Sequence, residues 1–209
     1  MIAPDYRGAG RSEKPVTPFG IDDMADDIAA LLDALGVAQV DVIGAALGCY
    51  AGTSLALRHA ARVRRLVLCA VAPEIDSRTS DYLRQRAPRV REGGMRAAVE
   101  ASLKNAFPEA HAAIRAEYRP RWLANDPAGF AALSLALADY VVNPEVWGRM
   151  TQPTLVLSGA HDFLWPPELG RVLASQIPGA RFGVLENAGH FPHLQDPAEL
   201  AQQALAHFV

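Results

Sequence analysis

Gly44, Ala46 and Gly48 have the spacing of a motif that presents a nucleophile. In the stretch GAALG (44–48) the glycines stand where a G-x-S-x-G turn has them, with Ser or Cys at the apex between a strand and a helix. The apolar run Val40–Ile43 precedes the turn, and a helical pattern follows it. Ala46 has no nucleophilic atom. The spacing therefore predicts a turn of this kind, but the residue at its apex cannot act as a nucleophile.

The elements around this turn alternate between helical and strand patterns, which is typical of a parallel sheet with helices on both faces. An apolar stripe from Ile21 to Leu35 predicts a covering helix that Gly36 ends, and Asp196 with Pro197 predicts the start of a last helix that runs to Phe208. Short aliphatic runs predict four buried parallel strands, at Gln39–Ile43, Arg65–Ala70, Thr154–Leu157 and Arg181–Leu185.

Strand patterns are absent between Pro73 and Met150. This stretch is rich in Ala, Arg and Leu, so we expect residues 73–150 to be a helical cap or lid, inserted into a core made of residues 1–72 and 151–209. We expect breaks between its helices at Pro88, Gly93–Gly94, Pro108, Pro120 and Pro127.

Composition excludes several classes of protein. The 209 residues, 50% of them hydrophobic, suit one domain with a sizeable core. A net charge of −3 with mixed signs argues against a nucleic-acid partner. Only Cys49 and Cys69 are present, which fits a reducing cytoplasm, and the longest apolar run, Leu66–Ala72, is too short to span a membrane.

The order of the motifs resembles the α/β-hydrolase superfamily over essentially the whole chain. APDYRGAGRS, VDVIGAALG, RRLVLCAVAP, PTLVLSGAHD and ENAGHFPHLQDP follow one another as in that fold. RVREGGM (89–95), NDPAGF (125–130) and GAHDFLWPP (159–167) are most similar to 3-oxoadipate enol-lactonases. The resemblance implies hydrolysis of a small ester, lactone or related acid derivative without a cofactor.

The same resemblance implies roles for individual residues. Asp162 matches the acid of the family and His190 matches its base, in the chain order elbow, acid, histidine. A carboxylate would hold the imidazole in one tautomer, so that it accepts a proton near neutral pH. The backbone N–H of Leu47, at the start of the helix after the elbow, would donate to a developing oxyanion.

The chain departs from the family pattern at its start. Ile2–Pro4 resembles the fourth strand of the family, so the first three strands and the loop with the second oxyanion donor are missing. We expect Ile2–Pro4 to lack its neighbour and strand 40–43 to have an open edge. One hypothesis is a gene start placed too late, at a GTG codon; a real truncated product is the alternative.

Ala46 has three interpretations. It is an engineered Ser→Ala change, a natural loss in a pseudoenzyme that binds a small acid or a partner protein, or a natural variant that still uses His190 and Asp162. The third is similar to aminoacrylate hydrolases of pyrimidine breakdown, in which Ala can occupy this position. There the histidine would activate water and no acyl-enzyme would form.

Other candidates have simpler explanations. Cys49 is expected to pack against the sheet as an inert thiol rather than replace the nucleophile. Ser12 shapes the site entrance at most, and the histidines lack the spacing of a metal site. We expect His161 and His193 at turns or rims, and His59, His111 and His207 on helix surfaces. Surface charge accounts for most of Arg84, Arg86, Arg89 and Arg91, although one or two could meet a substrate carboxylate, and packing accounts for Tyr118, Arg119, Trp122 and Tyr140.

Overall fold

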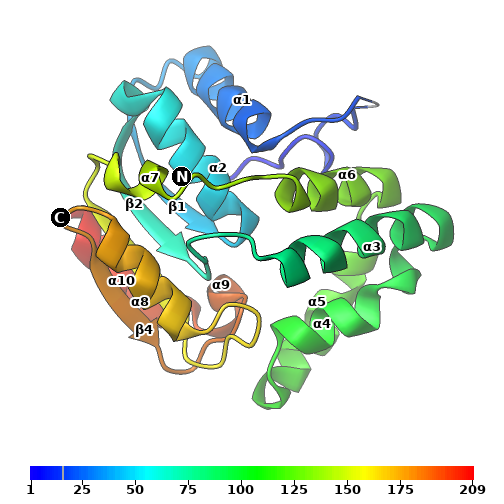
Figure 1. Cartoon of the computed structure of the whole chain (residues 1–209). Helices are drawn as coiled ribbons and strands as arrows, with labels where there is room; N and C mark the ends of the chain where they lie inside the picture. The colour runs from blue at the N-terminus through cyan, green and yellow to red at the C-terminus, as the bar shows by residue number, and fades with distance from the viewer. Residues whose placement is uncertain (16) are drawn as a thin grey trace.

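A parallel four-stranded sheet, in the order β1-β2-β3-β4, forms the centre of the fold in the computed structural model, which describes residues 1–15 and 17–209 (Figure 1). The predicted β4 matches at both ends, and the other three strands shift by one to two residues at one or both ends. The strands are β1 (Val40–Ala45), β2 (Val63–Cys69), β3 (Thr154–Gly159) and β4 (Arg181–Leu185).

Helices cover both faces of the sheet, as the alternating pattern predicted. Side chains alternate along β2: Leu66 and Leu68 pack beside α1, α2 and α8, whereas Val67 and Cys69 pack beside α10. The covering helices are α1 (Ile21–Ala34), α2 (Leu47–Arg58), α8 (Pro167–Gln176) and α10 (Pro197–Phe208), with the short η1 (Ala60–Arg62) before β2 and α9 (Pro192–Gln195) before α10.

The N-terminal side of the sheet has an open edge. Residues 1–6 form neither helix nor strand, and β1 pairs only with β2 among the described residues. Ile43 on β1 is 52% exposed. Both observations agree with the expectation for Ile2–Pro4 and for strand 40–43. The prediction that β1 is buried was wrong, because none of the described residues adds a strand along this edge.

The segment between β2 and β3 is helical, and its part from Ser77 to Ala138 lies to one side of the sheet (Figure 1). Asp76 and Asp126 accept hydrogen bonds from Thr79 and Gly129 at the starts of α3 and α6, which fixes where these helices begin. The segment contains α3 (Ser77–Gly93), η2 (Met95–Ala97), α4 (Val99–Ala106), η3 (Glu109–His111), α5 (Ala112–Leu123), α6 (Pro127–Ala138) and α7 (Glu145–Gly148).

Two of the expected breaks in this segment were wrong. Pro88 lies within α3 and Pro120 within α5. Both prolines are exposed, so the carbonyl groups that lose their helical N–H partner can be solvated. Packing of Ala87 and Val90 in α3 and of Trp122 in α5 keeps the helices continuous.

The apolar stripe of the first helix ends earlier than predicted. Ile21, Met24 and Leu32 are buried, but α1 ends at Ala34 and Leu35 is exposed beyond it. Gly36 follows with φ +65°, the left-handed conformation that glycine adopts most readily. The end of the helix at Gly36 was therefore predicted correctly, whereas the prediction that Leu35 lies on the packed face was wrong.

We expect Gly129→Ala to destabilise the protein by about 1–3 kcal/mol, because a Cβ at this position would lie 1.9 Å from the carbonyl oxygen of Gly8 and one backbone must move. Gly148→Ala is the matched control, since nothing lies within 4 Å of its Cβ position. Denaturant unfolding measures both. Equal stabilities of the two variants would contradict the close contact between α6 and the Gly8 turn.

Candidate functional site

The turn between β1 and α2 is strained at the residue that occupies the nucleophile position. Ala46 has φ +49° and ψ −119°, a backbone conformation that residues with a Cβ rarely adopt. A Cβ at Gly44 would lie 2.6 Å from the carbonyl oxygen of Gly48, so the start of α2 approaches position 44 too closely for a side chain there. The turn thus holds the position 46 side chain at the sharp junction of strand and helix.

Leu47 is the first residue of α2, a helix of 12 residues. Its N–H belongs to the first turn, where the helix itself provides no acceptor, and the partial positive charge of the helix terminus is centred there. An N–H group in this position can donate to an anionic oxygen formed beside Ala46.

Asp162 and His190 form a buried hydrogen-bonded pair. Nδ1 of His190 lies 2.9 Å from Oδ2 of Asp162. The other carboxylate oxygen, Oδ1, accepts hydrogen bonds from the N–H groups of Leu164 and Trp165, both at 2.9 Å. The carboxylate is therefore held on both sides, and its second oxygen fixes one nitrogen of the imidazole.

The loops that carry this pair are joined by their backbones. Asp162 follows β3 and His190 follows β4, and the N–H of His161 donates to the carbonyl of Ala188 at 2.9 Å. A Cβ at Gly159 would lie 2.4 Å from the carbonyl oxygen of Gly189. The absence of a side chain at Gly159 lets the two loops approach closely enough for the pair to form.

Parallel topology places Ala46, Asp162 and His190 at one edge of the sheet. Each of them follows the carboxyl end of a strand, and all the strands run in the same direction. Trp165 packs in the apolar cluster that Ala46 also contacts, and its ring meets that of His190 edge-on at 5.2 Å. The structure thus joins Asp162 and His190 directly and places Ala46 at the same edge of the sheet.

The two cysteines are buried and unpaired. Sγ of Cys49 lies 3.1 Å from the carbonyl oxygen of Cys69. Burial raises the pKa of the Cys49 thiol well above its usual value and raises the pKa of Cys69 to about 12. Neither thiol is suited to nucleophilic attack, which agrees with the prediction for Cys49.

A cavity of about 570 Å³ adjoins the loop of Asp162. Lys104 and Arg115 contribute positive charge to its wall, and Glu109, 3.5 Å from Arg115, contributes a negative one. The cavity extends from α4 and α5 to His161 and Phe163 after β3.

The remaining histidines do not take part in the Asp162–His190 pair. They are exposed or take part in packing. His161 and His193 are exposed, as expected of turn or rim residues, and His59 bonds to Asp26 at 2.7 Å. The prediction for His207 was wrong: it is buried, and Nδ1 of its ring lies 2.7 Å from Arg181. Among the described residues, no group of three or more His, Cys, Asp and Glu side chains could hold a metal ion.

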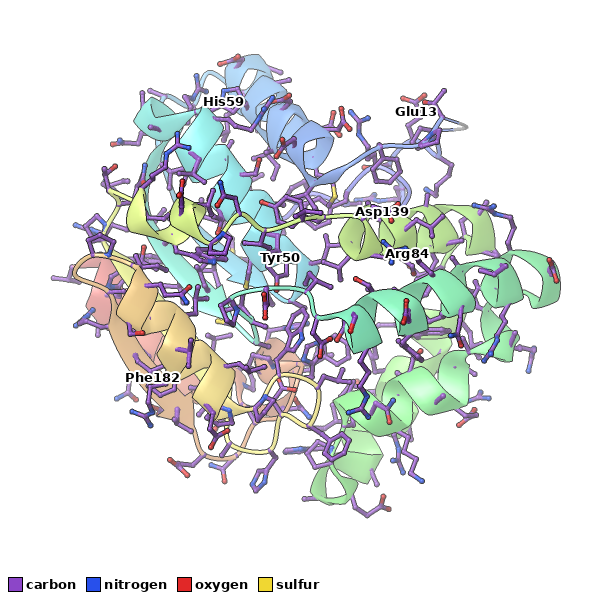
Figure 2. The ribbon with its side chains drawn as sticks, in the orientation of Figure 1. Glu13, Tyr50, His59, Arg84, Asp139 and Phe182 are labelled. Carbon is purple, nitrogen blue, oxygen red and sulfur yellow. The ribbon has the colours of Figure 1, made fainter. Side chains whose placement is uncertain are left out.

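Arg84 and Arg86 differ in their surroundings although they lie on the same helix. Arg84 pairs with Asp139 at 2.9 Å on the surface (Figure 2), and Arg86 lies over the ring of Phe130 and bonds to Ser134 at 3.1 Å. Arg89 and Arg91 are exposed.

The aromatic residues of the inserted helices pack as expected. Tyr118 lies against Phe107, Trp122 against Phe130, and Tyr140 against Tyr50. Arg119 pairs with Glu100 at 2.8 Å, and Ser12 bonds to the carbonyl of Asp5 at 2.7 Å.

The sequence analysis did not identify three residues of the site. Gly159 separates the loops, Trp165 packs on the imidazole, and Gln195 bonds to the backbone on both sides of His190. Their roles depend on partners from other parts of the fold, so the sequence alone does not single them out.

In sequence and in structure, the chain is similar to known hydrolases. The family described as alpha/beta hydrolase fold matches residues 1–197. "3-oxoadipate enol-lactonase 2" of Acinetobacter baylyi is 30% identical over 100% of this chain and 76% of its own length. "Putative carbamate hydrolase RutD" of Caulobacter segnis is also 30% identical, over 100% of this chain and 80% of its own length. The crystal structure of the enol-lactonase from Burkholderia xenovorans has a TM-score of 0.90 and 32% identity, covering 98% of this chain and 78% of that one.

We expect thiol reagents to leave Cys49 and Cys69 unmodified in the folded protein at pH 8, because the raised pKa keeps both thiols protonated and burial blocks access. Mass spectrometry after iodoacetamide treatment measures the modification, and the same reaction in urea is the control that should label both. Rapid labelling of Cys49 under folding conditions would show a reactive thiol.

Proposed function

The chain belongs to the alpha/beta hydrolase fold family, and from this membership and the geometry at the carboxyl edge of the sheet we propose that it hydrolyses a small ester or lactone, as an enol-lactonase does. The observation that carries the proposal is the buried Asp162–His190 pair at the same edge as the strained turn at Ala46. We propose as part of it that residues 73–150 are a cap over the core formed by residues 1–72 and 151–209.

The reaction we propose uses water in place of a side-chain nucleophile. With its Nδ1–H donated to Asp162, His190 has a lone pair on Nε2, which takes a proton from water as the water oxygen bonds to the substrate carbonyl carbon. The Leu47 N–H donates to the oxygen that becomes negative. The imidazolium then returns the proton to the leaving oxygen as the carbon–oxygen bond breaks.

Ala46 restricts the substrates for which this reaction is fast enough. Removing the serine of a triad leaves a rate about 10³–10⁴ above the uncatalysed reaction, supplied by the oxyanion donors and by binding. With that residual rate enhancement, a labile enol-lactone or an activated ester can still react at a useful rate, whereas an amide cannot.

A carbamate or aminoacrylate is the second candidate substrate. A relative of similar identity is named as a carbamate hydrolase, and the same histidine-activated water serves that reaction. A non-catalytic protein that binds a small acid or a partner is the alternative from another class.

We propose that the protein is cytoplasmic, because its two cysteines are buried and unpaired. None of the described helices is long and apolar enough to cross a membrane.

We expect His190→Ala in the protein with Ala46 to lower hydrolysis of an enol-lactone or a phenyl ester by about 10²–10⁴-fold, because it removes the base. Initial rates measure the effect, and His59→Ala is the matched control, since that ring bonds to Asp26 at the end of α2 and lies outside the loops of Asp162 and His190. A ligand that binds tightly and equally to both proteins, with no hydrolysis by either, would contradict the enzyme and favour the binding protein.

We expect Ala46→Ser to give a burst of product from p-nitrophenyl acetate, followed by slower turnover, because an acyl-enzyme can then form on the hydroxyl. Stopped-flow absorbance measures the burst, and the double variant with His190→Ala should lack it. Absence of a burst from an Ala46→Ser protein that is folded by circular dichroism would contradict the proposal that the rest of the triad is intact.

A further inference from the structure

We propose that Gln195 is a positioning residue for His190 and that it ties the histidine loop to helix α4. Gln195 is the last residue of α9 and is only 8% exposed. Its Oε1 accepts hydrogen bonds from the N–H of Gly189 at 2.9 Å and from the N–H of Phe191 at 2.8 Å. One side-chain oxygen therefore holds both neighbours of the histidine.

The carbonyl group of Ala106 completes this arrangement. Ala106 is the last residue of α4, and its oxygen accepts a hydrogen bond from the N–H of His190 at 3.3 Å. Nε2 of Gln195 donates to the same oxygen at 3.4 Å. The N–H groups of residues 189, 190 and 191 thus all have acceptors, which are one amide side chain and one carbonyl of the inserted helices.

An amide suits this place better than the side chains that resemble it. Glutamate would accept from both N–H groups, but it has no hydrogen to donate to Ala106 and would set a negative charge against that carbonyl. An aliphatic side chain would leave two buried N–H groups without acceptors. The site is also tightly filled, since a Cβ at Gly189 would lie 3.0 Å from Nε2 of Gln195.

The consequence for His190 is positional. Its bond to Asp162 fixes the rotation of the ring, and the hydrogen bonds of Gln195 and Ala106 fix the backbone from which the ring projects. Displacement of a base by about 1 Å is enough to cost about 10²-fold in rate. The position of α4 and the direction of the imidazole are thereby coupled, through the side chain of Gln195 and through the hydrogen bond from the N–H of His190 to Ala106.

The test compares Gln195→Ala with Gln152→Ala in the full chain. Gln152 is the matched control because it is also buried and its Nε2 also donates to a backbone carbonyl, that of Ala56 at 3.1 Å, outside the histidine loop. Two readouts need no activity: hydrogen exchange of the Gly189 and Phe191 amides, and the NMR signal of the Nδ1 proton of His190. The kinetic readout, which rests on the proposed function, is the acylation rate in the Ala46→Ser background.

Gln195→Ala should speed exchange of the two amides by about tenfold or more, weaken the Nδ1 proton signal, and lower acylation by about 10–100-fold without a matching change in KM. Gln152→Ala should change none of these beyond its effect on global stability. Gln195→Glu should keep both amides protected and yet lower acylation, because it removes the Nε2 donor that lies 3.4 Å from both the Ala106 carbonyl and Nδ1 of His111.

Unchanged exchange and an unchanged Nδ1 signal in Gln195→Ala would overturn the positioning role, as would equal changes in Gln152→Ala. If the Ala46→Ser reference itself forms no acyl-enzyme, the proposed function fails, and the exchange and NMR results still decide the role of Gln195.

Discussion

The close approach of Gly44 to Gly48 is the constraint on which the site depends. The chain passes from the end of β1 into α2 within one residue, and Gly44 allows this because it carries no Cβ where its backbone meets that of Gly48. The residue between them must then adopt a positive φ, and Ala46 does so at +49° without a functional group that would justify the strain. The elbow is thus a property of the glycines, and it persists whatever residue stands at its apex.

The other half of the site depends on how closely two loops approach. Gly159 allows the loops after β3 and β4 to touch, and the Asp162–His190 hydrogen bond forms across that contact. The inserted helices take part through Ala106, whose carbonyl binds the backbone of His190. The sheet and the helices between β2 and β3 therefore meet at His190, whose backbone position depends on packing well outside the sheet.

Local signals predicted much of this arrangement. Aliphatic runs predicted the four strands, Asp196 with Pro197 predicted the last helix, and the glycine spacing around Ala46 predicted the turn. Features set by tertiary contacts were missed. Pro88 and Pro120 continue their helices because packing and solvated carbonyls outweigh a local preference. His207 is buried and contacts Arg181 at the start of β4 and the carbonyl of Pro153 before β3. Gln195 has a role that only the fold reveals, since its partners lie in the histidine loop and in α4.

The central claim is that the elbow and the Asp162–His190 pair are assembled as in an active hydrolase, with only the nucleophilic oxygen lacking. The most direct measurement is the reaction of Ala46→Ser with a fluorophosphonate, followed by mass spectrometry of the intact chain and its peptides. The account predicts one phosphonyl group per chain at position 46, and none on the protein with Ala46. No adduct on a folded Ala46→Ser protein would contradict the claim.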